Sequence, residues 1–185
     1  MHKQDKKTYK KVVKNLIKHV AKIDHFLHLW YNINMRKFEV VRADAIKYDV
    51  VPTKMPQRAT KNSAGYDLYS PIDIVIAPKS MEMIWTNVKA QFEADEVLLL
   101  CVTSGMGKHS IMLANTLGVI DSDYYGNVSN DGNLGLRLYN FGDEPYEIKV
   151  GDKIGQGIFM KYLTVDDEPE ITTERVGGFG STVKK

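Results

Sequence analysis

From Met35 onward, the sequence alternates short apolar stretches with clusters of turn residues. Four of these stretches, residues 72–76, 81–85, 97–102 and 134–139, are five or six residues long, and several alternate apolar with polar side chains. A period of two is typical of a β-strand with one buried face. Because such strands recur and no long helical pattern interrupts them, this segment predicts an all-β sandwich, jelly roll or barrel.

The first 34 residues follow a different pattern. Apolar residues recur at helical spacing between Tyr9 and Trp30, and eight lysines against two aspartates give the segment a formal charge of +6. The pattern predicts a basic amphipathic helix of about five turns. Two interpretations stay open: the apolar stripe packs on the chain's own domain with the lysines in solvent, or the helix docks on an unknown partner.

Glycine and charge also divide the chain. All 14 glycines lie at position 65 or later, and residues 35–185 hold 17 basic against 21 acidic residues, a formal charge of −4. We therefore expect three parts: a helical extension at 1–34, a β domain at 35–165 and a C-terminal arm at 166–185. The arm is acidic and then glycine-rich, a composition typical of a flexible end that becomes ordered when something binds it.

Cysteine content and hydropathy bear on the compartment. Cys101 is the one cysteine of the chain, so no intrachain disulfide can form, and a reducing, cytoplasmic location is favoured. No apolar stretch approaches the roughly 18 residues that a membrane-spanning helix needs. We expect a cytoplasmic protein without a membrane span.

Five stretches of the β domain and the arm carry residues suited to binding phosphate or activating water. Taken singly, each has an ordinary explanation, because Gly-Asp pairs form turns and a short glycine-rich loop does not establish phosphate binding. Their order along the chain is more informative than any one of them. The stretches are Ser63–Leu68, Thr103–Lys108, Gly118–Gly126, Gly151–Gln156 and Arg175–Thr182.

In this order the stretches resemble the five motifs of the trimeric dUTPase family (dUTP diphosphatases), which run approximately AGYDL, RSG, GxIDxDYxG, GDRIAQ and RGxxGFGST. The resemblance covers roughly residues 36–182, and five ordered motifs are a specific signal. It implies a β jelly roll, in agreement with the strand pattern, so that the expected fold is an all-β jelly roll with an added N-terminal amphipathic helix.

The resemblance also implies an activity and an assembly. The family hydrolyses dUTP to dUMP and pyrophosphate by Mg²⁺-assisted attack of water on the α-phosphorus, which keeps uracil out of DNA and supplies dUMP for thymidylate synthesis. We therefore expect a nucleotide hydrolase whose substrate is dUTP. We also expect a homotrimer with shared active sites, in which the tail of one chain covers the site of another.

Residues of the third motif and its hairpin would bind the nucleoside. Asp121 matches the general base that takes a proton from the attacking water. Tyr124 matches the aromatic ring that packs on the deoxyribose and leaves no room for a 2′-hydroxyl. Asp123 would point to the other face of a regular strand, so it is interpreted as a structural residue or one that supports the site without touching the substrate. Uracil would be recognised by the backbone around four residues: Asn115, Gly118, Ile120 and Gly135.

Residues of the other motifs would bind the triphosphate. Arg175 would clamp the terminal phosphates as the arm closes, because a guanidinium fork matches phosphate geometry, and Phe179 would stack on the uracil. Asp67 would reach Mg²⁺ through water, with the ion held mainly by the triphosphate; its alternative is a turn-capping carboxylate. The remaining phosphate contacts would come from Ser104, Gly105, Gln156, Gly180 and Ser181.

The sequence also departs from the family pattern. Thr103 stands where an arginine is usual, Tyr125 stands where a basic or polar residue is usual, and the hairpin segment 126–133 is longer than in the common pattern. None of these changes removes a reacting group. We expect them to alter the affinity for the nucleotide rather than to abolish the reaction.

Two alternatives are weighed against dUTP hydrolysis. A dCTP deaminase shares parts of the second and third motifs, but its chemistry needs a glutamate at the position of Asn127, so hydrolysis without deamination is preferred. A nucleotide-responsive regulatory protein, with the basic helix as its partner surface, is the alternative from a different class.

Overall fold

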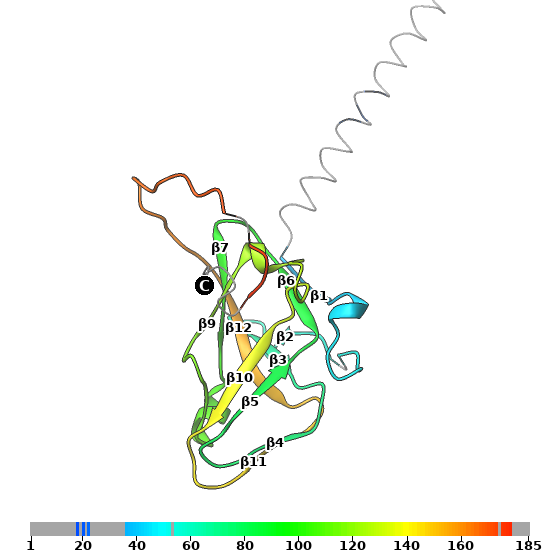
Figure 1. Ribbon diagram of the computed structural model, residues 1–185, viewed down its shortest axis with the longest axis vertical. Helices are drawn as coiled ribbons and strands as arrows, with labels where there is room; N and C mark the ends of the chain where they lie inside the picture. The colour runs from blue at the N-terminus through cyan, green and yellow to red at the C-terminus, as the bar shows by residue number, and fades with distance from the viewer. Residues whose placement is uncertain are drawn as a thin grey trace, which may run out of the picture. The chain divides into compact units, whose positions relative to one another are not determined.

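The computed structural model describes residues 36–52, 54–173 and 175–178, together with the isolated positions Lys18, Val20 and Lys22 (Figure 1). The amphipathic helix predicted for residues 1–34 lies outside the described residues except at those three positions. The predicted site residues Phe179, Gly180 and Ser181 also lie outside them.

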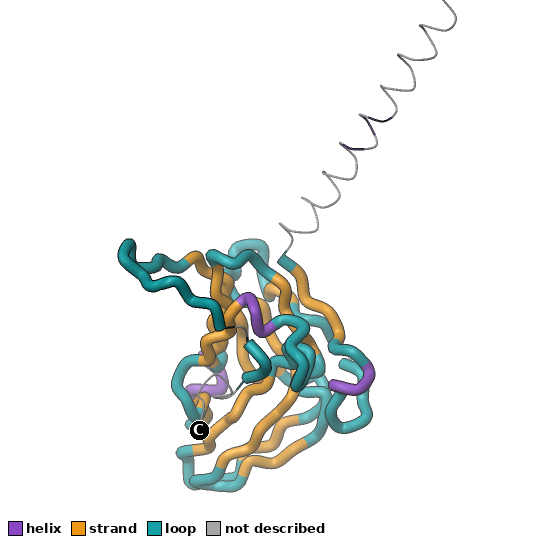
Figure 2. Tube along the Cα trace, turned by 45° about the horizontal axis from the view of Figure 1, so that its top comes forward, coloured by secondary structure: helices purple, strands orange, loops and turns teal. Residues whose placement is uncertain are grey.

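Antiparallel strands make up most of the regular secondary structure of the described residues, and Figure 2 shows them joined by loops and short helical segments. The twelve strands of the described residues are β1 (Lys37–Val40), β2 (Gln57–Arg58), β3 (Tyr66–Tyr69), β4 (Ile74–Ile76), β5 (Met81–Trp85), β6 (Val88–Gln91), β7 (Glu96–Cys101), β8 (Ile111–Leu113), β9 (Gly118–Asp121), β10 (Gly135–Asn140), β11 (Tyr146–Ile148) and β12 (Lys153–Lys161). The helical segments are α2 (Ser104–Lys108) and the 3₁₀ helices Ala43–Ala45 and Ser122–Tyr124. The predicted all-β architecture is confirmed for these residues.

The strands form four sheets. The largest has the order β2-β3-β12-β7-β9, a second has the order β5-β10-β8, and two further pairs are β1-β6 and β11-β4. Every pairing is antiparallel. In the described residues, no helix is long and apolar enough to cross a membrane.

The core lies between the two larger sheets. Strand β7 alternates buried with half-buried residues and contributes Leu98 and Leu100, while β10 contributes Leu136 and Leu138. The two layers meet closely at Gly155 of β12, because a side chain there would collide with Leu136. Burying each of these leucines contributes about 1.5–3 kcal/mol, so the period-two pattern of the sequence is what holds the layers together.

The hairpin of β8 and β9 passes from one layer to the other. Strand β8 pairs with β10 in the three-stranded sheet, whereas β9 pairs with β7 at the edge of the five-stranded sheet. The turn between them contains Thr116 at φ 61°, in the left-handed region. This crossing leaves a space between the layers, and the third motif begins on its wall.

Candidate active site

A pocket of about 360 Å³ lies at this crossing, between β8, β9 and β10. Two of its glycines stand where a side chain would not fit: a Cβ at Gly135 would lie 2.7 Å from Cε3 of Trp85, and one at Gly118 would lie 3.0 Å from Cβ of Leu100. The pocket wall is therefore backbone at these points, and its amides and carbonyls border the cavity. Seven of the residues predicted from the sequence line it: Asn115, Gly118, Ile120, Asp121, Tyr124, Gly135 and Arg175.

Two carboxylates lie at the pocket's edge. Asp121 is the last residue of β9, opposite Val97 of β7, and half of its side chain is exposed. The strand ends there and a 3₁₀ turn follows, which brings Asp123 to the same cation as Asp121. The expectation that Asp123 points to the other face of a regular strand missed this contact, because the sequence does not reveal where the strand ends.

The cation is Arg175 of the C-terminal arm. Its Nη2 forms an ion pair with Oδ2 of Asp121, its Nε lies 2.5 Å from Oδ1 of Asp123, and 18% of its side chain is exposed. Gly178, three residues further along, lies against the Tyr124 ring, because a Cβ there would be 2.6 Å from Cε2 of Tyr124. The described part of the arm thus covers the pocket of its own chain. Covering of another chain's pocket stays a prediction.

Tyr124 is 5% exposed and fixed by hydrogen bonds at its phenol. The hydroxyl donates to the backbone carbonyl of Asn133 (3.0 Å), and the phenol oxygen accepts from Nδ2 of Asn130 (2.6 Å). Burial raises the pKa of Tyr124, against the smaller opposing effects of Asn130 and the Arg175 charge. The ring is therefore neutral at physiological pH.

Four predicted residues do not line this pocket: Asp67, Ser104, Gly105 and Gln156. Asp67 and Gln156 face each other across β3 and β12, and the Gln156 side chain lies directly over Gly65. Nζ of Lys153 lies 2.7 Å from Oδ2 of Asp67, so that the buried carboxylate already has a cation beside it. Asp67, Gln156 and Lys153 thus lie together on β3 and β12, outside the pocket of Asp121.

Ser104 and Gly105 begin α2 and are exposed. Thr103 caps this helix, since its Oγ1 accepts from the Met106 amide at 3.4 Å and its carbonyl accepts from the Gly107 amide at 3.1 Å. The departure from the family's arginine at this position therefore has a local structural role, the N-cap for which threonine is suited.

The donor set of the site fits a magnesium ion that is carried mainly by a substrate. Within the described residues, no group of three or more His, Cys, Asp or Glu side chains could hold a metal ion. Mg²⁺ commonly binds through one or two carboxylates together with phosphate oxygens and water. Each carboxylate near the site is paired with a cation of the chain, Asp121 and Asp123 with Arg175 and Asp67 with Lys153, so phosphate oxygens and water would supply most of the ligands.

Sequence reasoning also missed the asparagines behind Tyr124. Asn127, Asn130 and Asn133 are spaced three residues apart in the hairpin segment that was noted only for its length, and all three are buried. Repeated asparagine at a fixed spacing is a signal that could have found them, because buried polar side chains occur where they are hydrogen-bonded.

Comparison with known proteins gives consistent matches over this region. The family model described as dUTPase matches residues 52–183. The deoxyuridine 5′-triphosphate nucleotidohydrolase of Lactococcus lactis subsp. lactis (strain IL1403) is 40% identical over 152 residues, which cover 81% of this chain and 99% of the relative. The crystal structure of dUTPase from Streptococcus mutans is 33% identical with a TM-score of 0.60, over 70% of this chain and 98% of that chain. A D95N mutant dUTPase from phage phi11 of S. aureus, whose structure details the coordination of a structural Mg(II) ion, shares the fold at 22% identity and a TM-score of 0.57, over 76% of this chain and 100% of that chain.

Proposed function

The chain belongs to the dUTPase family and hydrolyses dUTP to dUMP and pyrophosphate, and we propose that Asp121 is the general base of this reaction. The observation that carries the proposal is the position of Asp121 at the edge of the pocket, beside the backbone walls at Gly118 and Gly135. A half-exposed carboxylate there can accept a hydrogen bond from a water molecule and take its proton as the water attacks the α-phosphorus. The P–O bond to the leaving pyrophosphate breaks in the same displacement.

Magnesium is proposed as the cofactor. Mg²⁺ across the triphosphate supplies neutralisation of phosphate charge and polarises the phosphoryl oxygens. Asp67, which is buried beside Lys153, would reach the ion through water. The protein's own contribution is then to hold the α-phosphate beside Asp121 and to limit access of bulk water.

Discrimination between nucleotides is assigned to the two ends of the pocket. The backbone around Asn115, Gly118, Ile120 and Gly135 would bind the edge of uracil. The Tyr124 ring would pack on the deoxyribose and exclude a 2′-hydroxyl, because a close-fitting apolar surface offers neither space nor a hydrogen-bond partner. UTP would be rejected by this contact.

A homotrimer with shared sites is proposed from the separation of the two groups of residues. Ser104, Gly105 and Gln156 lie outside the pocket of Asp121 in one chain, yet a single nucleotide has to contact both groups. A neighbouring copy would supply the second group. We also propose that the sheets form the jelly roll of the family. A cytoplasmic location is proposed as well, and the free thiol of Cys101 supports it.

The arm is proposed to exchange partners during the reaction. Arg175 holds Asp121 and Asp123 in the described state, so it has to release Asp121 before that carboxylate can act as a base. The guanidinium would then clamp the terminal phosphates. Stacking of Phe179 on uracil, and phosphate contacts from Gly180 and Ser181, remain predictions for the outer part of the arm.

Asp121→Asn tests the general base. We expect kcat for dUTP to fall by about 10²–10⁴-fold, with nucleotide binding largely retained, since the amide keeps the shape of the carboxylate. Asp123→Asn is the matched control, because it also removes a charge that contacts Arg175, and its kcat should change far less. Near-normal turnover by Asp121→Asn would refute the assignment.

Substrate choice is tested by measuring pyrophosphate release from dUTP, dCTP, dTTP and UTP, with and without Mg²⁺. We expect release from dUTP alone at an appreciable rate, and a strong dependence on Mg²⁺. Ammonia released from dCTP would favour the deaminase alternative, which the comparisons do not favour.

A further inference from the structure

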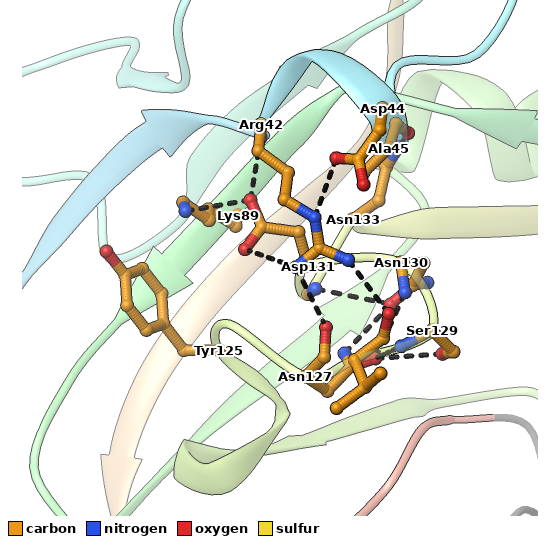
Figure 3. A network of polar contacts seen from close by, with 12 residues as sticks. Arg42, Asp44, Ala45, Lys89, Tyr125, Asn127, Ser129, Asn130, Asp131 and Asn133 are labelled. Atoms are coloured by element: carbon orange, nitrogen blue, oxygen red, sulfur yellow. Dashed lines mark hydrogen bonds and ion pairs between the residues drawn. The ribbon is translucent and has the colours of Figure 1, made fainter.

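Next to Tyr124 lies the asparagine loop, defined here as residues 127–133, in which Asn127, Asn130, Asp131 and Asn133 are buried. Figure 3 shows these four side chains among their polar contacts. Burying an amide without a hydrogen-bond partner costs roughly 1–3 kcal/mol in proteins, so several buried asparagines require a dense network. The loop supplies one, and Tyr124 is part of it.

Asn127 binds the backbone of Tyr124. Its Nδ2 donates to the Tyr124 carbonyl at 2.8 Å and to Oδ1 of Asn130 at 2.8 Å. Its Oδ1 accepts from the amides of Ser129 (3.0 Å) and Asn130 (3.1 Å). The orientation of this side chain is fixed, because backbone amides can only donate and therefore must face its oxygen.

Asn130 binds the other end of Tyr124. Its Oδ1 accepts from Nδ2 of Asn127 and from the Gly132 amide at 3.2 Å, which leaves Nδ2 to donate to the Tyr124 phenol oxygen at 2.6 Å. Since that oxygen accepts from Asn130, the phenol proton is free to go to the Asn133 carbonyl. The direction of every hydrogen bond around the ring is thus determined.

The loop is itself anchored to the rest of the domain. The Asp131 carboxylate accepts from the Arg42 amide at 2.7 Å and lies 2.8 Å from Nζ of Lys89 on β6. Nδ2 of Asn133 donates to the Ala45 carbonyl at 3.1 Å and to Oδ1 of Asn87 at 3.0 Å. Because these contacts fix the loop, the loop can in turn fix the position of the Tyr124 ring to which it is hydrogen-bonded.

We propose that Asn130 is a positioning residue for sugar discrimination, which holds the Tyr124 ring in the place where it excludes a ribose. The inference rests on the proposed role of Tyr124. Steric exclusion of a hydroxyl is only as strong as the cost of moving the excluding group, and a displacement of about 1 Å is enough to change reaction rates strongly. Without the Nδ2 donor the phenol keeps one hydrogen bond of two, and the ring can yield to a 2′-hydroxyl.

The test compares kcat/KM for dUTP with kcat/KM for UTP in the full chain. Asn130→Ala removes the hydrogen bond to the Tyr124 phenol, and with it the two that Oδ1 accepts from Asn127 and Gly132. It should lower the dUTP/UTP ratio by roughly 3- to 10-fold, the effect on the ring of losing the bond to its phenol, mainly by raising the rate with UTP. Ser129→Ala is the matched control, because Ser129 hydrogen-bonds Asn127 in the same loop without touching Tyr124, and its ratio should stay at the wild-type value. The ratio does not depend on the fraction of folded enzyme, so a partly unfolded variant still gives an answer.

Tyr124→Phe removes the same hydrogen bond from the other side, together with the one that the phenol donates to the Asn133 carbonyl. It should lower the ratio by at least as large a factor, and adding Asn130→Ala to Tyr124→Phe should lower it no further, because the contact between the two residues is then already absent. Independent, additive effects of the two substitutions would overturn the inference. So would an unchanged ratio in Asn130→Ala, or an equal fall in Ser129→Ala.

Tyr124→Ala separates failure of the inference from failure of the proposed role. If Tyr124→Ala leaves the dUTP/UTP ratio unchanged, the ring does not discriminate the sugar, and the proposed role of Tyr124 falls together with the inference. If Tyr124→Ala lowers the ratio but Asn130→Ala does not, the role of Tyr124 stands and only the inference is overturned.

Discussion

Asp131→Asn is expected to destabilise the folded protein by about 2 kcal/mol at pH 7. Asp131 is buried and has φ 60°, a left-handed conformation that asparagine tolerates, so that the substitution removes charge without straining the backbone. Lys89, whose side chain is 15% exposed, loses the carboxylate 2.8 Å from its Nζ. Breaking a fully buried pair costs about 3–5 kcal/mol. Because the amide oxygen of asparagine can still accept from Arg42 and Lys89, we expect a loss below this range, about 2 kcal/mol.

The loss should depend on pH in a defined direction. Burial disfavours the Asp131 carboxylate, but the hydrogen bonds from Lys89 and the Arg42 amide, with the charges of both residues, outweigh it and hold the pKa of Asp131 below its usual range. A carboxyl with a lowered folded-state pKa stabilises the protein above its unfolded pKa of about 3.9, and the contribution is lost as pH falls through the folded value. The difference in the free energy of unfolding between wild type and Asp131→Asn should therefore be constant from about pH 7 to pH 5 and become smaller below about pH 4.

The assay is urea unfolding at a fixed protein concentration, since the stability of an oligomer depends on concentration. Asp44→Asn is the matched control: Asp44 lies 2.7 Å from Nε of Arg42, but its side chain is 73% exposed, and such pairs contribute at most about 1 kcal/mol. A loss in Asp131→Asn no larger than in Asp44→Asn, or a gap that stays the same at pH 3, would refute the reasoning.

Two further predictions concern the pocket and the arm. Gly135→Ala places a methyl group 2.7 Å from the Trp85 ring, so it should lower stability by about 1–3 kcal/mol and raise KM for dUTP. Thermal unfolding and steady-state kinetics measure the two effects. The control Gly107→Ala, at a position where a Cβ meets no neighbouring atom within 4 Å, should leave the melting temperature near that of the wild type. Removing residues 175–185 should strongly lower kcat/KM for dUTP and leave the melting temperature near that of the full chain. A wild-type rate in the truncated chain would exclude arm closure.

Strands with strong local signals could be predicted from the sequence, and a short strand that carries a charged residue could not. The stretches 72–76, 81–85 and 97–102 overlap β4, β5 and β7, because their alternation and flanking turns are local. Strand β6 was not predicted. It has only four residues and carries Lys89, whose charge is neutralised by Asp131, 42 positions further along the chain.

The candidate site divides in the same way. Asp121, Tyr124 and the glycines of the pocket could be identified from motif order, since each lies in a stretch with a recognisable sequence. The supports of these residues could not, because Asn130 acts through the Tyr124 phenol and Asp123 through the arm's Arg175. Such contacts depend on where a strand ends and on which way a side chain turns, and neither follows from spacing along the chain.

The contact of Arg175 with Asp121 and Asp123 also bears on how binding measurements are to be interpreted. In the proposed role of Arg175, the two carboxylates compete with the terminal phosphates of the substrate for the same guanidinium. Nucleotide would then bind fully only to molecules with an open arm, in which Arg175 has left Asp121 and Asp123. The apparent dissociation constant is then the intrinsic one divided by the open fraction, and an open fraction of about one tenth weakens apparent affinity roughly tenfold. The affinity measured for dUTP thus reflects two equilibria, the opening of the arm and the binding of nucleotide to the open form. Salt weakens ion pairs and therefore also favours the opening of the arm.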